Sequence, residues 1–113
     1  MHKSLTLACA LVALAASPAF AADGNIDAGR QKNSMCIGCH GIPDYKTAYP
    51  VVYSVPRIGG QHAKYLASAL AAYKSGDRKH PTMRAIAASL SEQDMADLAA
   101  YYAAQGGTQT AAK

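Results

Sequence analysis

The feature that most constrains this chain is the stretch Cys36-Ile37-Gly38-Cys39-His40. Two cysteines three positions apart lie on the same side of a helical turn, so both sulfurs face one partner. This spacing, with a histidine directly after the second cysteine, is typical of covalent haem attachment. The histidine imidazole is then placed to bind the haem iron. The stretch therefore predicts one haem c, bound covalently through Cys36 and Cys39, with His40 as the proximal ligand.

Three other interpretations of the two cysteines explain less. A thioredoxin-like redox pair needs a βαβ setting, and the chain has little strand pattern. A zinc site needs more ligands, and the only other cysteine, Cys9, lies in a segment that we expect to be removed. A plain disulfide is compatible with the spacing but gives His40 no role.

Residues 1–22 have the pattern of a secretory signal peptide. Lys3 gives a positive start, and the run over 5–16 is almost wholly apolar. That run is too short to span a bilayer. Small residues mark a cleavage site, so we expect the mature chain to start at Ala22 or Asp23. The expected location is the periplasm, without stable membrane insertion.

The mature chain has the size of one small domain. Loss of residues 1–22 removes one basic residue and no acidic one, which lowers the formal charge from +4 to +3. A core of about 90 residues is marginal by itself, and a covalent haem supplies an apolar plate on which helices pack. We expect one domain over residues 23–107, a polar tail over 108–113, and no nucleic-acid partner.

The spacing of apolar residues and the end signals predict an all-α fold of about three main helices, a short helix and loops. The first helix runs from Ile26 or Asp27 into the cysteine motif, with Asp27 as N-cap or first-turn acid. The second begins near Gln61 or His62 and stops at Gly76.

A short helix is predicted from Arg84 to Ala88, followed by the clearest helix of the chain. Ser91 is the expected N-cap of that last helix, Asp94 lies where a capping acid belongs, and Gly106-Gly107 ends it. Its buried side is formed by Met95, Leu98, Tyr101 and Tyr102.

Residues 41–55 predict an ordered loop, because glycine and prolines interrupt any helical pattern. Tyr45, Tyr49 and Tyr53 recur at intervals of four, but Pro50 argues against a continuous helical stripe. We interpret these tyrosines as an apolar lid over one haem edge, with hydroxyls that reach water or a propionate.

Together these features resemble a bacterial class I c-type cytochrome. The chain is similar to the small periplasmic monohaem carriers and to one haem domain of the dihaem members. The resemblance covers Asp27 to Gln105 and rests on the cysteine motif, on residues 56–61, on Met83, and on Leu98 with Tyr101. It implies the small class I cytochrome c fold, wrapped around one covalent haem.

The resemblance also implies roles for individual residues. In this family a proline carbonyl meets the proximal histidine, which implies a contact from Pro56 to His40. The aliphatic side chain two positions later packs on the ring, which implies that role for Ile58. The first and last helices cross through a glycine and an aromatic residue, here Gly29 against Tyr101.

A haem propionate needs a hydrogen-bond donor, and this chain has no tryptophan to supply it. The role therefore falls to Arg57, a loop tyrosine or Gln61.

The second axial ligand has five candidates: Met35, Met83, Met95, His62 and His80. Met35 adjoins the cysteine motif and cannot reach the opposite face of the ring. Met95 lies on the apolar stripe of the last helix, where a core role is favoured. Met83 lies in a predicted irregular segment after a proline and matches the family position, so we favour it. His80 is the next candidate, since histidine also binds haem iron.

Two axial ligands leave no open position on the iron, which favours electron transfer over catalysis. Methionine, a soft neutral ligand, raises the reduction potential relative to a second histidine. We therefore expect a periplasmic one-electron carrier and not an enzyme. The alternatives are the haem subunit of a periplasmic dehydrogenase or oxidoreductase complex, and a haem sensor or peroxidase-like protein.

The segment around the proposed ligand is basic, which favours a redox partner with an acidic docking surface. Its charges are Lys74, Arg78, Lys79 and Arg84. Glu92, Asp94 and Asp97 start the last helix, where we expect them mainly to complement the helix dipole. The expected oligomeric state is a monomer or weak dimer.

Overall fold

The computed structural model describes residues 22–48 and 51–108. Residues 1–21 of the predicted signal peptide and 109–113 of the predicted tail lie outside this range. The elements are α1 (Ile26–Lys32), α2 (Ser34–His40), β1 (Lys46–Thr47), β2 (Tyr53–Ser54), α3 (Ala63–Ser75), α4 (Pro81–Ala88), α5 (Glu92–Ala103) and the 3-10 helix η1 (Ala104–Thr108). Helices dominate, so the predicted all-α class is confirmed. Within the described residues, no helix has the length and apolar character needed to cross a membrane.

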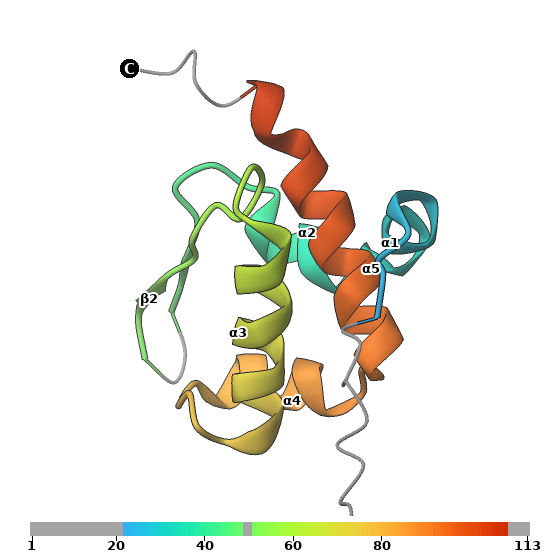
Figure 1. Ribbon diagram of the computed structural model, residues 1–113. Coiled ribbons are helices and arrows are strands. Elements are labelled where there is room, and N and C mark those ends of the chain that lie inside the picture. Colours follow the sequence, from blue (N-terminus) through green and yellow to red (C-terminus); the bar gives the residue numbers. More distant parts are fainter. Residues whose placement is uncertain (1–21, 49–50, 109–113) are drawn as a thin grey trace, which may run out of the picture.

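The core lies along α5, between α3 on one side and α1 on the other (Figure 1). Leu66 of α3 packs with Ala99 and Tyr102 of α5. Leu98, 2% exposed, packs with Met95 and with Leu90, which directly precedes the N-cap of α5. The predicted buried side of the last helix is thus confirmed, except that Tyr101 is only half-buried.

Gly29 is where α1 and α5 touch. A Cβ at this position would lie 2.1 Å from the Asp97 carbonyl oxygen and 2.7 Å from Tyr101 Cβ. No other residue fits such an approach without moving one helix. The implied crossing of Gly29 against Tyr101 is therefore confirmed.

The first predicted helix is interrupted, so the prediction of one continuous helix into the cysteine motif is wrong. α1 ends at Lys32 and α2 begins at Ser34, with Asn33 between them. Asn33 is 6% exposed, and its side-chain oxygen accepts a hydrogen bond from the Tyr102 hydroxyl. Its amide nitrogen lies 3.5 Å from the Tyr101 hydroxyl. We attribute the break to these bonds, since a buried amide must be satisfied and here its partners lie on α5.

Most predicted helix ends are confirmed. Asn25 caps α1, which leaves Asp27 as the first-turn acid. Gly76 ends α3 in the left-handed conformation, with φ of 92°. Ser91 and Asp94 form a reciprocal capping box on α5. The predicted stop at Gly106-Gly107 is wrong, because α5 ends at Ala103 and η1 continues to Thr108.

The short helix before α5 starts earlier than predicted. α4 begins at Pro81, so Met83 lies in its first turn and not in an irregular segment. Proline is favoured at the first helical position, because its missing amide hydrogen would have no partner there. The His80 side chain caps the helix and accepts from the Met83 amide. The two predictions, a start at Arg84 and an irregular setting for Met83, are therefore wrong.

The segment 41–55 is ordered where it is described, and it contains a short hairpin. Strands β1 and β2 pair antiparallel, with Lys46 opposite Ser54. Tyr45 and Tyr53 are half-buried, and their role as a lid stays a prediction. Tyr49 and Pro50 lie outside the described residues. Figure 1 shows the hairpin on the side of α3 away from α1.

Candidate functional site

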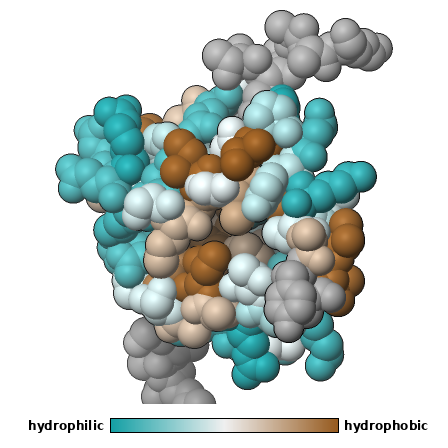
Figure 2. Space-filling view, turned by 180° about the vertical axis from the view of Figure 1, so that it is seen from behind, coloured by the Kyte–Doolittle hydropathy of each residue, from teal (hydrophilic) through white to brown (hydrophobic). Residues whose placement is uncertain are grey.

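One cavity of about 420 Å³ brings the predicted site residues together. All eight line it: Cys36, Cys39, His40, Pro56, Arg57, Ile58, Gln61 and Met83. They come from α2, from the loop between β2 and α3, and from α4. Figure 2 shows a hollow in one face of the molecule, with apolar residues around it. Residues that are more than 40 positions apart in the sequence therefore meet at one site.

The two thiols lie on α2, one helical turn apart, and both are free and half-buried. Cys36 packs against both hydrophobic clusters of the core, beside Leu66 and Leu98. Burial raises the pKa of the Cys36 thiol. The thiols are thus presented to the cavity from an apolar wall.

His40 ends α2, and its ring is fixed by the backbone. Its Nδ1 lies 2.7 Å from the Pro56 carbonyl oxygen, the contact that the resemblance implied. A carbonyl only accepts hydrogen bonds, so Nδ1 carries the proton and the lone pair is on Nε2. Histidines that bind a metal through one ring nitrogen are commonly oriented by a hydrogen bond from the other, as Nδ1 makes here.

The five candidates for the second axial ligand differ in whether they line the cavity. Met83 and His80 line the cavity, as does Met35, which shares α2 with the cysteines. Met95 is 5% exposed and packs with Leu90 and Leu98, which supports its predicted core role. His62 is the exposed N-cap of α3 and does not line the cavity.

His80 uses one ring nitrogen elsewhere. Its Nδ1 lies 3.3 Å from the Met83 amide nitrogen, which donates to it. The proton of the neutral ring is then on Nε2, so neither nitrogen offers a free lone pair. This geometry favours Met83 over His80 as the second ligand.

The donor set and the walls fit a haem c. Two thiols one turn apart match the two attachment points, and an oriented imidazole matches the iron. The rest of the wall is mainly apolar, with contributions from Ile58, Leu66, Leu70, Leu98 and Tyr102. Such a wall removes a large apolar ring from water, which is favourable at about 25 cal/mol per Å². The sequence alone did not indicate Leu70 or Ala69 as lining residues, although their spacing from Leu66 on one helix face is a usable signal.

Arg57 and Gln61 lie at the edge of this cavity and are both exposed. Gln61 offers only a neutral amide donor at Nε2, and its Oε1 accepts from the His62 amide at 2.9 Å. Arg57 offers a charged, forked donor, which suits a carboxylate. Of the two, Arg57 is better placed chemically to meet a propionate.

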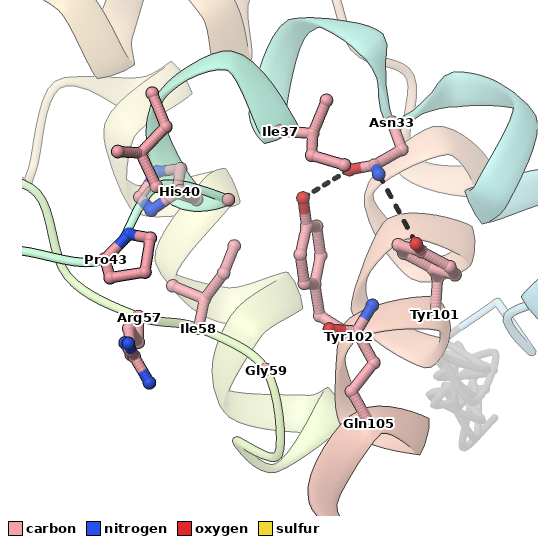
Figure 3. A pocket seen from close by; sticks show the side chains of 12 residues that line it. Asn33, Ile37, His40, Pro43, Arg57, Ile58, Gly59, Tyr101, Tyr102 and Gln105 are labelled. Carbon is pink, nitrogen blue, oxygen red and sulfur yellow. Dashed lines mark hydrogen bonds between the residues drawn. The ribbon is translucent and has the colours of Figure 1, made fainter. Parts of the chain in front are cut away.

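A second cavity, of about 290 Å³, shares His40, Arg57 and Ile58 with the first (Figure 3). Tyr102 lines both cavities, and Figure 3 shows its hydroxyl bonded to Asn33. Burial raises the pKa of the Tyr102 hydroxyl, so it remains a proton donor. Asn33 was missed by sequence reasoning, because a polar residue between helical segments has no periodic signal.

The charges around the site are arranged differently from the prediction. Asp97 is not a solvated dipole partner: it is 2% exposed, and its Oδ2 lies 2.6 Å from Lys32 Nζ. Among the basic residues, Lys74 donates to the Leu90 carbonyl. Arg78 lies over the Tyr73 ring, with its guanidinium carbon 4.6 Å from the ring centroid. Two of the four predicted docking charges thus have structural contacts.

Comparison with known proteins agrees with this geometry. The family model described as Cytochrome c matches residues 26–104. Cytochrome c-554(548) of Halomonas halodenitrificans is 40% identical over 73% of this chain and 98% of its own length. Cytochrome c4 of Pseudomonas aeruginosa is 37% identical over 74% of this chain, which spans only 40% of that protein. Cytochrome c-552 of Acidithiobacillus ferridurans is 36% identical over 93% of this chain and 47% of its own length.

Proposed function

The chain belongs to the cytochrome c family, as a bacterial class I c-type cytochrome with haem c bound through Cys36 and Cys39, and we propose that it is a periplasmic one-electron carrier with His40 and Met83 as axial ligands. When bound, haem c supplies an iron that alternates between the ferrous and ferric states. Family membership supports haem-based electron transfer with redox partner proteins. The ligand pair, the compartment and the absence of enzyme activity are the parts that we add.

One observation supports the assignment of the ligand pair. His40, oriented by Pro56, and Met83 line one apolar cavity from different helices. His40 and Met83 would both bind the iron of a bound haem, which would leave no site for substrate on that iron. The thioether of Met83 is a soft neutral ligand that favours the ferrous state. The apolar wall acts in the same direction, because low dielectric disfavours the additional positive charge of the ferric state.

The ligand assignment is tested by Met83→Ala in the intact holoprotein. The variant should keep its covalent haem, lose the methionine–iron charge-transfer band, bind carbon monoxide and show a lower reduction potential. Met95→Leu is the matched control, since that methionine lies in the core outside the cavity, and it should keep the band. A Met83→Ala protein with an unchanged spectrum and potential would move the assignment to another residue.

The proposal of a periplasmic location rests on the signal-peptide pattern of residues 1–22 and on the chemistry of the cysteine pair. Intact mass of the protein recovered from the periplasmic fraction should equal one haem plus a chain that starts at Ala22 or Asp23. Acid-acetone treatment should leave the haem on the polypeptide, because Cys36 and Cys39 hold it covalently. A cytoplasmic, unprocessed chain would contradict the periplasmic role.

The chain spans less than half the length of the cytochrome c4 and c-552 relatives, although it spans nearly all of cytochrome c-554(548). We propose a monomer or weak dimer that meets its partners by diffusion. Copurification of a dehydrogenase at fixed stoichiometry would instead favour a haem subunit of a larger complex.

A further inference from the structure

The first turn of α4 carries Met83, and the residue that caps this turn is His80. The first amides of a helix have no acceptor within the helix. Pro81 has no amide hydrogen to satisfy, whereas the Met83 amide donates to His80 Nδ1 at 3.3 Å. The His80 side chain therefore holds the backbone of the proposed ligand directly.

Histidine is not a preferred N-cap residue, because Ser, Thr, Asp and Asn fill that position best. What the imidazole adds is aromatic contact. Its centroid lies 4.2 Å from that of the Tyr53 ring, tilted by 48°, and 6.3 Å from that of the Tyr73 ring, edge-on at 78°. Ring pairs at these separations attract each other beyond their apolar burial. An asparagine would cap as well or better but would lose both ring contacts, so His80 combines two roles.

Three elements meet at this imidazole. Tyr53 belongs to β2 and Tyr73 to α3, while His80 is the N-cap of α4. The guanidinium of Arg78 also lies over the Tyr73 ring. All four residues line the same cavity as Met83. The first turn of α4 is thus tied to the hairpin and to α3 at the wall of the haem site.

We propose that His80 is a positioning residue for Met83: its cap bond and ring contacts hold the first turn of α4 so that the Met83 thioether stays in the cavity. His80 acts through the Met83 backbone and not as an iron ligand. The inference rests on the proposed role of Met83, and it adds a residue that controls how often this ligand leaves the iron.

The test measures how fast imidazole replaces Met83 on the ferric iron of the intact holoprotein, at saturating imidazole. Three variants separate the two contacts of His80. His80→Asn keeps a cap acceptor and loses the ring, His80→Phe keeps a ring and loses the acceptor, and His80→Ala loses both. The replacement rate should rise in all three and most in His80→Ala, by about tenfold, with a weaker methionine–iron band.

Ser91→Ala is the control for a general loss of stability. It removes the N-cap of α5, and Ser91 is not among the residues that line the cavity, so it should lower the melting temperature and leave the imidazole rate unchanged. A wild-type rate in His80→Ala would overturn the proposal, and so would an equal rise in Ser91→Ala. Tyr53→Leu provides a further check, because its effect should be smaller in the His80→Asn background, where the ring contact is already lost.

The two hypotheses fail separately. An unchanged spectrum in Met83→Ala contradicts the ligand assignment itself. A changed spectrum in Met83→Ala, together with wild-type behaviour of the His80 variants, leaves the carrier function intact and contradicts only the positioning role.

Discussion

At the scale of single residues, Gly29 decides how closely α1 and α5 approach. Gly29→Ala should lower the free energy of unfolding by about 2–3 kcal/mol, because the added methyl would overlap backbone atoms of α5 and force the helices apart. Chemical denaturation of the holoprotein measures this change. Gln31→Ala, on the exposed side of the same helix, should change stability little. Equal stability of the two variants would contradict this prediction, because it would mean that α1 and α5 move apart at Gly29 without loss of stability.

Asp97 is the second residue whose role is clear from its contacts. Its Oδ1 accepts from the Asn25 amide at 2.8 Å, and its Oδ2 pairs with Lys32. The Lys32 ammonium first, and then the Asn25 and Gln93 donors, hold the pKa of Asp97 below its usual range. The carboxylate thus ties the start of α1 to α5.

The depressed pKa gives a pH dependence with a definite sign. A carboxyl group with a lower pKa in the folded state stabilises the fold above its unfolded pKa of about 3.9, and this contribution is lost as pH falls below that value. Asp97→Asn should therefore lower the free energy of unfolding at pH 7 and flatten its fall between about pH 5 and pH 2. Urea unfolding across this pH range measures both effects. Parallel stability curves for the variant and the parent would contradict this role.

At the scale of elements, Asn33 connects the start of α2 to α5. Tyr102→Phe leaves the buried Asn33 side-chain oxygen without this donor, which should cost about 1–2 kcal/mol of folding free energy. Tyr101→Phe should cost less, since the contact from Asn33 Nδ2 to the Tyr101 hydroxyl is 3.5 Å long. Thermal and urea unfolding of the two variants would compare them, and a larger loss in Tyr101→Phe would reverse the assignment.

The end of α3 offers a prediction that depends on the backbone alone. Gly76 has φ of 92°, and the nearest atoms to a Cβ there would belong to the Arg84 guanidinium, at 3.6 Å or more. Gly76→Ala should thus lose about 1 kcal/mol from conformational strain without a steric clash. Gly76→Asn should lose less, because asparagine tolerates the left-handed conformation better. Equal losses in both variants would point to the side-chain environment instead.

Elements whose ends depend on neighbours in the sequence could be predicted from it. The Ser91 capping box and the stop at Gly76 each act within a few residues, so local chemistry decides them. The break at Asn33 and the early start of α4 could not be predicted in this way. Asn33 depends on a hydroxyl of α5, and the cap by His80 is reinforced by rings from β2 and α3.

The same distinction applies to the site. Cys36, Cys39 and His40 lie within five residues of each other, so their spacing alone predicts that they bind one haem. The hydrogen bond from His40 to Pro56 could be predicted only from the family resemblance, because no local sequence pattern joins residues 16 positions apart. Arg78 and Tyr73 meet only in the folded chain, and the sequence alone therefore predicts Arg78 as a docking charge.

At the scale of the whole molecule, we propose that the basic segment around Met83 docks an acidic partner; its charges are Lys74, Arg78, Lys79 and Arg84. Lys79 tests it better than Arg78, since Arg78 also contacts Tyr73. Lys79→Glu should slow electron transfer to the physiological partner by about threefold at low salt and leave the reduction potential unchanged. The difference should shrink as added salt screens the charges.

Stopped-flow rates across a salt series measure this effect. Arg30→Glu is the matched control: it makes the same change in net charge on α1, which contributes no residue to the cavity wall. Equal slowing by both variants would indicate an effect of net charge and not a docking site.

The contact between α1 and α5 also bears on the order of events when the chain is made. The bond from the Asn25 amide to Asp97 joins residues 72 positions apart, and Gly29 packs against the same stretch of α5. Asn25 and Gly29 therefore meet their partners on α5 only after the last helix has emerged. The contact between α1 and α5 can thus close only when the whole chain is available, which makes it a long-range step of folding.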